Sequence, residues 1–276
     1  MELLLFATAG VESGIGFLSK KYIMRGMDYK EYFYYVTVAL LPLSLIMFLF
    51  YPFYISISFL SVSIIMASVM VRFIGSVSYT LAVKKTSPLE ISAYSTFAIL
   101  ITYFVDSFIG SVSFNIWALV SLFIIILGCI LIAREQLDFK NVEGALFVKI
   151  VTDVLKGYLT YFALKEMSSA MYIFLMAFIS VLIMVPFTKK FITFNFNKLK
   201  QGTYLQLLGI MDLALLNLLA SNSATLYMLR VPAVMVTTFL LSFFIKKDVG
   251  NKPDKLEFLG SMVVFTGLTI FTILQF

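Results

Sequence analysis

Five ionisable residues lie near the centres of long apolar stretches of the chain. They are Glu12, Arg72, Asp153, Lys156 and Asp212. An ionisable side chain at the centre of a bilayer costs about 2.5–3.5 kcal/mol on insertion scales, so such residues either pair with one another or line a pathway. Carboxylates at this depth can hold a substrate cation or a coupling proton, and Arg or Lys can hold a substrate anion. The alternative interpretation is a set of buried ion pairs that locks the helices together.

Helical spacing brings other polar side chains to the same faces as these ions. On one stretch the shared face comprises Asp153, Lys156, Gly157 and Thr160. On another it comprises Arg72, Ser76 and Tyr79. Aromatic walls with polar tips are available from Tyr79, Tyr94 and Tyr158. We therefore predict a polar cavity whose substrate-binding or coupling residues are Glu12, Arg72, Tyr79, Tyr94, Asp153, Lys156 and Asp212.

The composition indicates that the elements carrying these residues are membrane helices. Of 276 residues, 61% are hydrophobic and 13% are charged, and the mean hydropathy is +0.99. A soluble domain is about half apolar and about a quarter charged. Most of this chain's surface must therefore face lipid, and we expect an all-α integral membrane protein.

Several function classes are excluded by residues that the sequence lacks. It contains no His, and its single cysteine is Cys129. A His-based catalytic dyad, a disulfide within the chain and a zinc site of Cys and His are therefore excluded. No G-x-x-x-x-G-K-[ST] motif is present, so the chain does not bind ATP as a P-loop pump. We expect no enzyme activity, no metal and no cofactor.

Hydropathy predicts about ten transmembrane helices joined by short connections. The ten stretches are approximately 3–19, 32–51, 61–83, 89–109, 115–133, 144–164, 169–188, 203–223, 230–245 and 257–275. The longest polar stretch, 134–143, lies halfway along the chain, and no stretch is long enough for a domain outside the membrane. A GxxxG pattern at Gly10 and Gly14 predicts close helix packing, and Asp106, near the outer end of its stretch, is expected to contact water.

Two halves of the chain resemble each other. Residues 11–19 (VESGIGFLS) align with 152–160 (TDVLKGYLT), so that Glu12 matches Asp153 and Gly16 matches Gly157. Because five is odd, two related five-helix units must insert with opposite orientation. We predict two inverted repeats, 1–135 and 136–276, and inverted repeats place Glu12 and Asp153 on opposite sides of an axis near the membrane midplane.

Loop charge supports this arrangement independently. Sixteen Lys and Arg residues fall in the odd-numbered connections, whereas only Lys165 and Arg230 fall in the even-numbered ones. Basic loops stay in the cytoplasm, so both termini are expected outside. The net charge of +6 is therefore interpreted as an orientation signal and not as a nucleic-acid surface.

The whole pattern resembles the drug/metabolite transporter superfamily, EamA-type branch. The stretch that carries the resemblance is 79–93, YTLAVKKTSPLEISA, which is similar to the family's passage from helix three to helix four. The resemblance implies a substrate cavity between the two halves, lined mainly by helices one, three, four, six, eight and nine.

These observations lead to a secondary transporter of a small polar organic metabolite, amino acid-like or amine-like, that works by alternating access with proton coupling left open. One alternative is an exchanger of phosphorylated or nucleotide-linked metabolites that are gripped by Arg72 and Lys156. An alternative from another class is a lipid-handling membrane enzyme or assembly factor. The expected partners are a small-molecule substrate and membrane lipid, with a homodimer left open. The expected location is the plasma, or inner, membrane of a prokaryote.

Overall fold

The structure, a computed structural model, describes residues 1–24, 27–56, 58–85, 88–134, 144–189, 194–244 and 255–275. Helices account for nearly all of these residues, and within them no strand forms beyond an isolated antiparallel bridge between Ile55 and Met167. The elements are α1 (Glu2–Met24), α2 (Tyr29–Ser44), the 3-10 helix η1 (Leu45–Leu49), α3 (Phe59–Lys85), α4 (Pro88–Thr96), α5 (Ala98–Ile109), α6 (Ile116–Ala133), α7 (Gly144–Glu166), α8 (Ser169–Lys189), α9 (Phe196–Ala220), α10 (Ala224–Phe244) and α11 (Lys255–Gln275).

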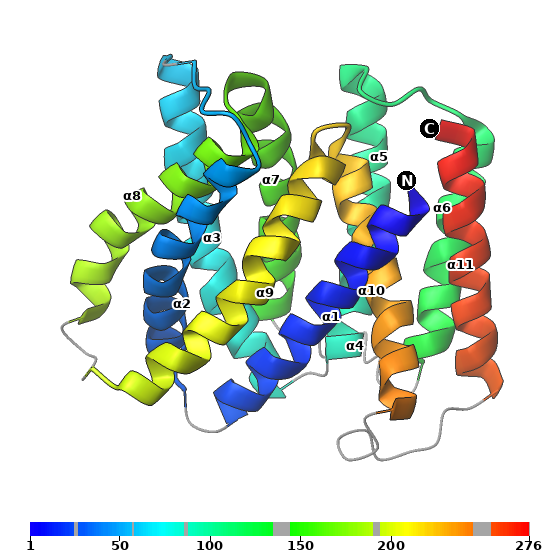
Figure 1. Cartoon of the computed structure of the whole chain (residues 1–276). Helices are drawn as coiled ribbons and strands as arrows, with labels where there is room; N and C mark the ends of the chain where they lie inside the picture. Colours follow the sequence, from blue (N-terminus) through cyan, green and yellow to red (C-terminus); the bar gives the residue numbers. More distant parts are fainter. Residues whose placement is uncertain are drawn as a thin grey trace.

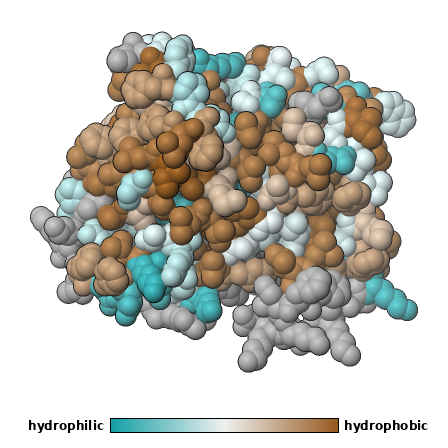
Figure 2. Space-filling view, in the orientation of Figure 1, coloured by the Kyte–Doolittle hydropathy of each residue, from teal (hydrophilic) through white to brown (hydrophobic). Residues whose placement is uncertain are grey.

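Eight segments in the described part of the chain are long and apolar enough to cross a membrane. They lie in α1, α2 with η1, α3, α4 with α5, α6, α9, α10 and α11. Across the middle of the face in Figure 2 the surface is largely apolar, and exposed aromatic residues include Phe59 and Phe108. Exposed aromatic and aliphatic side chains on this scale need lipid around them, so the chain is an all-α membrane protein.

The two helices outside this set are α7 and α8. Helix α7 carries Lys149, Asp153 and Lys156 within two turns, which lowers its hydropathy. Helix α8 contributes a shorter apolar stretch, Ser169–Ile183.

Two predicted spans are interrupted by residues that disturb the helical hydrogen bonds. The span at 89–109 is divided at Phe97, whose amide donates to the carbonyl of Tyr94, three residues back, at 3.3 Å. A bond across three residues tightens the helix locally and interrupts the α-helical pattern. In the span at 32–51, Pro42 lacks an amide donor, and α2 gives way to η1 after Ser44.

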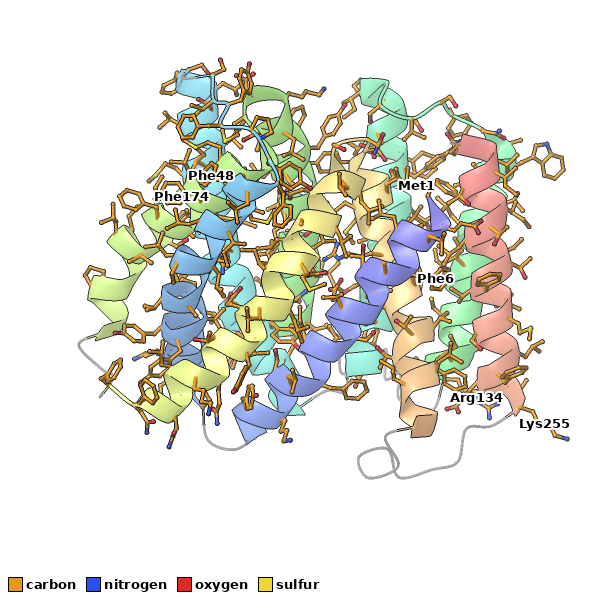
Figure 3. All side chains as sticks on the ribbon, viewed as in Figure 1. Met1, Phe6, Phe48, Arg134, Phe174 and Lys255 are labelled. Atoms are coloured by element: carbon orange, nitrogen blue, oxygen red, sulfur yellow. The ribbon has the colours of Figure 1, made fainter. Side chains whose placement is uncertain are left out.

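Helix α10 is the centre of the bundle. In its apolar window 83% of the residues are buried, against 28–56% in the other seven windows. It packs against α1, α4 and α5, and the pair α6 and α11 forms one edge of the molecule (Figure 1). At the opposite edge, η1 contacts α8 through Phe48 and Phe174, whose ring centroids are 5.7 Å apart (Figure 3).

Both termini lie at the same end of the bundle (Figure 1). Arg134, at the end of α6, and Lys255, at the start of α11, lie at the opposite end from Met1 (Figure 3). The sequence predicts the basic connections on one side of the membrane and both termini on the other. The positions of Arg134 and Lys255 agree with this prediction.

Close helix packing occurs between α6 and α11, and not at the GxxxG pattern of α1. A Cβ on Gly128 would lie 2.8 Å from the carbonyl oxygen of Gly260, and a Cβ on Gly260 would lie 2.8 Å from that of Gly128. Apart from the adjoining residues and backbone of α1 itself, no atom of the described residues lies within 4 Å of a Cβ placed on Gly10 or Gly14. The prediction for Gly10 and Gly14 was therefore wrong, because the spacing of two glycines does not specify which face of a helix meets a neighbour.

Replacing Gly128 by Ala is expected to destabilise the protein by about 1–3 kcal/mol, because the clash is with backbone and cannot be relieved by a rotamer change. The measurement is the free energy of unfolding by denaturant titration in mixed micelles. Gly10→Ala is the matched control and should be neutral or slightly stabilising, since alanine favours the helix and meets nothing. Equal stability of the two variants would contradict the close approach of α6 and α11.

Candidate functional site

A cavity of about 310 Å³ lies in the middle of the bundle. Its lining comes from α1, α3, α4, α7, α9 and α10, with further residues from α2 and α8. Seven charged side chains line it: Glu12, Arg72, Lys149, Asp153, Lys156, Asp212 and Arg230. A concave site with convergent charged groups inside an apolar bundle is a candidate pathway or binding site.

The cavity gathers most of the residues that the sequence singled out. Lining positions are held by Glu12, Arg72, Tyr79, Asp153, Lys156 and Asp212. Tyr94 is not in the lining, and it packs in a neighbouring hydrophobic cluster with Ile91 and Leu205. Tyr158 is also outside the lining, and its hydroxyl donates to the carbonyl of Thr102 at 3.0 Å.

Two lining cations were missed by the sequence analysis. Lys149 was placed inside a span but not selected, although it lies four residues before Asp153 and so on the same helical face. Arg230 was placed in the connection before the ninth span, yet it is 4% exposed inside α10. A local signal for the earlier start of α10 exists, because the hydroxyl of Ser223 accepts the amide of Leu226 at 3.0 Å, as an N-cap does.

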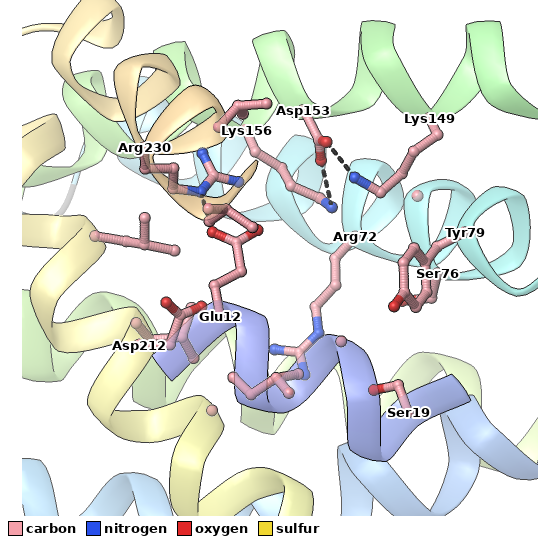
Figure 4. A pocket seen from close by; sticks show the side chains of 18 of the residues that line it. Glu12, Ser19, Arg72, Ser76, Tyr79, Lys149, Asp153, Lys156, Asp212 and Arg230 are labelled. Carbon is pink, nitrogen blue, oxygen red and sulfur yellow. Dashed lines mark hydrogen bonds and ion pairs between the residues drawn. The ribbon is translucent and has the colours of Figure 1, made fainter. Parts of the chain in front are cut away.

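Glu12 forms an ion pair with Arg230 across the cavity wall. The Nε of Arg230 donates to Oε2 of Glu12 at 2.7 Å (Figure 4). The same guanidinium donates from Nη1 to the carbonyl of Tyr227 at 2.9 Å and lies 4.0 Å from the centre of the Tyr227 ring. These contacts fix Arg230 and hold α1 against α10.

Asp153 is held between two lysines of its own helix. The ammonium of Lys149 donates to Oδ2, and that of Lys156 donates to Oδ1 at 3.3 Å (Figure 4). The Lys156 ammonium also lies close above α3, 2.8 Å from where a Cβ on Gly75 would stand. The cluster therefore joins α7 to α3 and keeps three charges together in the cavity wall.

Arg72 and Asp212 have a different environment. Arg72 has no hydrogen bond or ion pair with any described residue, although it lines the cavity and carries five donor hydrogens. Asp212 also has no ion pair within the described part of the chain, and its buried Oδ1 has no hydrogen-bond partner there. It lies beside the pair of Glu12 and Arg230 (Figure 4). Two opposite charges thus face the cavity without partners.

Hydroxyl groups complete the polar wall at two places. The hydroxyl oxygens of Ser19 on α1 and Tyr32 on α2 are 3.2 Å apart, within hydrogen-bond distance. The hydroxyl of Tyr172 donates to Ser68 at 3.0 Å and lies 3.4 Å from that of Thr160. These groups can exchange hydrogen bonds with a polar solute.

The cavity lining runs along much of the length of the bundle. On the side of the termini it includes Tyr172, Asn217 and Tyr227, near the start of α8, the end of α9 and the start of α10, and it also approaches the opposite end. At that end it reaches Phe17 and Ser19 near the end of α1, Tyr32 near the start of α2, and Ile91 near the start of α4. These helix ends lie at the lower end in Figure 1, and the termini lie at the upper end.

At the end of the bundle near the termini, Asp106 joins α5 to α10. It is fully buried, and its Oδ2 accepts both the amide and the hydroxyl of Thr225, each at 2.6 Å. The expectation that Asp106 contacts water was therefore wrong. Its carboxylate caps the first turn of α10 from a neighbouring helix, where a negative charge is favoured by the helix dipole.

We expect Asp106→Ala to lower the free energy of unfolding by about 1–3 kcal/mol, because two buried donors of Thr225 lose their acceptor. Asp106→Asn keeps an acceptor oxygen at the same place, so its free energy of unfolding should fall by less than that of Asp106→Ala. The comparison is made by denaturant titration of both variants. If alanine and asparagine are equally tolerated, the cap does not contribute to stability.

No group of three or more acidic or cysteine side chains that could hold a metal ion occurs within the described ranges. Comparison of the sequence with models of known protein families gives no match. Comparison with curated proteins gives no significant match either. The functional assignment therefore depends on the chemistry of the cavity.

Proposed function

We propose that this protein is a secondary transporter that moves a small polar organic metabolite across the membrane by alternating access. The observation that carries the proposal is the central cavity, where Arg72 and Asp212 face the space with no partner among the described residues. Charges at membrane depth without structural partners are costly, and a solute that pairs with them offsets that cost.

We further propose ten spans in two inverted repeats, 1–135 and 136–276, with α7 and α8 as the sixth and seventh spans. Helix pairs recur in the way such repeats require. Helix α3 packs on α7, and their counterparts α9 and α1 also pack together. Helix α2 packs on α9, and its counterpart α8 packs on α3. This recurrence supports a pseudo-two-fold axis through the cavity.

We infer membership of the drug/metabolite transporter superfamily, EamA-type branch. The motif at 79–93 supports it, as does the cavity lining, because the helices implied by the resemblance correspond to α1, α3, α4, α7, α9 and α10. In such a fold, one half rocks against the other around a midplane site.

The size of the cavity favours a small solute over a nucleotide-linked one. Its 310 Å³ is at the lower end of the range of about 300–1,000 Å³ for ligand pockets. The four cationic side chains against three acidic ones favour a solute that carries an anionic group. A small phosphorylated metabolite is therefore the second candidate, with Arg72 and Lys156 as its phosphate contacts.

The proposal is tested by solute flux into proteoliposomes that contain the purified protein. The panel comprises labelled amino acids, amines and sugar phosphates, each with and without a pH gradient, and protein-free liposomes are the control. Uptake of a member of the panel that depends on the protein supports transport. Formation of a lipid-linked product without solute movement would replace transport by a lipid-handling activity.

The charge of the connections predicts orientation. With sixteen basic residues in odd-numbered connections, a reporter fused after Phe276 is expected to report a non-cytoplasmic C-terminus. A reporter inserted between Arg134 and Glu143 is the matched control and should report the cytoplasm. A cytoplasmic signal from the C-terminal fusion would reverse the proposed orientation.

A further inference from the structure

We propose that the cavity binds a small organic zwitterion of the amino-acid type, with its carboxylate on Arg72 and its ammonium on Asp212. The inference rests on the proposed function and specifies its substrate class. It starts from the division of the seven cavity charges into two groups. Five are engaged with one another, as Glu12 with Arg230 and as Asp153 with its two lysines, and two are not.

Each of the two unpartnered groups can form an ion pair with a ligand group of opposite charge. The guanidinium of Arg72 presents a planar fork that matches a carboxylate, with two parallel hydrogen bonds available. The carboxylate of Asp212 can accept hydrogen bonds from an ammonium, and its Oδ1 is buried with no donor in the described part of the chain. A simple amine would leave Arg72 without a partner, and a simple anion would leave Asp212 without one. A single ligand with both charges satisfies both.

The two groups also occupy related places in the proposed repeats. Arg72 is on α3, and Asp212 is on its counterpart α9. The offset of 141 residues that relates Glu12 to Asp153 carries Arg72 to Leu213, the neighbour of Asp212. One half thus contributes a positive group and the other half a negative group, from two helices that are counterparts in the proposed repeats. A dipolar solute lying across the axis would contact both halves at once.

The charge balance of the cavity is consistent with a zwitterion. The lining has four cationic side chains and three carboxylates, so its formal charges sum to +1. A zwitterion has no net charge and leaves this sum unchanged. Because the proposed contacts are Arg72 and Asp212, the Glu12–Arg230 pair and the Asp153 cluster keep their partners when the solute binds. The small volume restricts the ligand to a single compact solute.

The test measures binding to the purified protein in nanodiscs by calorimetry and thermal shift, using the twenty proteinogenic amino acids as the probe panel. The tightest binder is then compared with its methyl ester, its decarboxylated amine and its N-acetyl derivative. Loss of either charge is expected to weaken binding on the order of tenfold to a hundredfold, the value of a hydrogen-bonded charge. Binding raises the unfolding temperature by mass action.

Variants assign each charge to its residue. In Arg72→Gln the amino acid should bind no better than its methyl ester, and in Asp212→Asn it should bind no better than its N-acetyl derivative. Lys21→Gln and Glu166→Gln make the same charge changes outside the cavity lining and should keep the wild-type preference. The analogue comparison in the wild type does not depend on any variant folding.

Three outcomes overturn the inference: no amino acid binds, an analogue lacking one charge binds as well as its parent, or Arg72→Gln keeps the preference for a free carboxylate. Flux measured in parallel separates this inference from the transport proposal. If an amino acid binds as expected but does not cross proteoliposomes, the site stands and transport fails. If only amines or sugar phosphates are carried, transport stands and the zwitterion site fails.

Discussion

Arg72→Gln is expected to leave the fold at least as stable as the wild type and to reduce transport by at least an order of magnitude. The residue has no ion pair or hydrogen bond to lose within the described residues, so no partner is left uncompensated. Because the variant removes an unpaired charge whose burial in the membrane is costly, its free energy of unfolding should not fall below that of the wild type. The loss of transport follows from the missing contact to the solute, which is a charged hydrogen bond worth about 1.5–3 kcal/mol.

The contrast with Arg230→Gln makes the result specific. That variant removes the same charge from the same cavity, but it leaves Glu12 unpaired and also removes a bond to the Tyr227 carbonyl. It should therefore unfold more easily than Arg72→Gln. Denaturant titration gives the stability, and initial uptake rates in proteoliposomes give the transport. Unchanged uptake by well-folded Arg72→Gln would remove Arg72 from the site.

Asp153→Asn is expected to lower the free energy of unfolding by about 3–5 kcal/mol. The neutral amide has the same volume, but it leaves the ammonium groups of Lys149 and Lys156 close together in a buried wall. Breaking one partner of a buried ion pair typically costs this amount, because the remaining charge is uncompensated. Expression level and unfolding in mixed micelles report the loss.

A second substitution tests the cause of that loss. Adding Lys149→Met to Asp153→Asn removes one of the two uncompensated charges and should recover part of the stability. If Asp153→Asn is as stable as the wild type and yet inactive, the carboxylate acts on the solute and does not hold the cluster together.

The membrane class and most helix positions were predictable, because long apolar stretches specify membrane helices without reference to their neighbours. The break at Phe97 was not, since no Pro or Gly marks it and a continuous apolar stretch predicts a continuous helix. Arg230 was assigned to a connection because the first turns of α10 are polar. They lower the hydropathy averaged over a window, so the predicted span begins too late. The cap at Ser223 was the local signal that such averaging obscures.

The candidate residues were predictable as a set but not in their roles. Ionisable residues in apolar stretches identified five cavity-lining positions, and helical spacing added Tyr79. The sequence left open whether Glu12 and Asp153 bind solute or form structural pairs, and the geometry supports pairs for both. Glu12 meets Arg230 from 218 residues away, a contact that no local spacing encodes. That Arg72 has no ion pair among the described residues becomes known only when the other charged side chains of those residues have been placed.

The central claim is that one cavity is reached from each side of the membrane in turn. It is tested most directly by labelling a single cysteine at Ser76, which lines the cavity, in a chain whose buried Cys129 is replaced by Ala. A membrane-impermeant thiol reagent is applied from each side of proteoliposomes that retain solute uptake. A cysteine at Ser121, which is fully buried outside the cavity lining, is the control and should not react. We expect the cysteine at position 76 to react from both sides and the transported solute to slow both reactions; reaction from one side only, with or without solute, would contradict alternating access through this cavity.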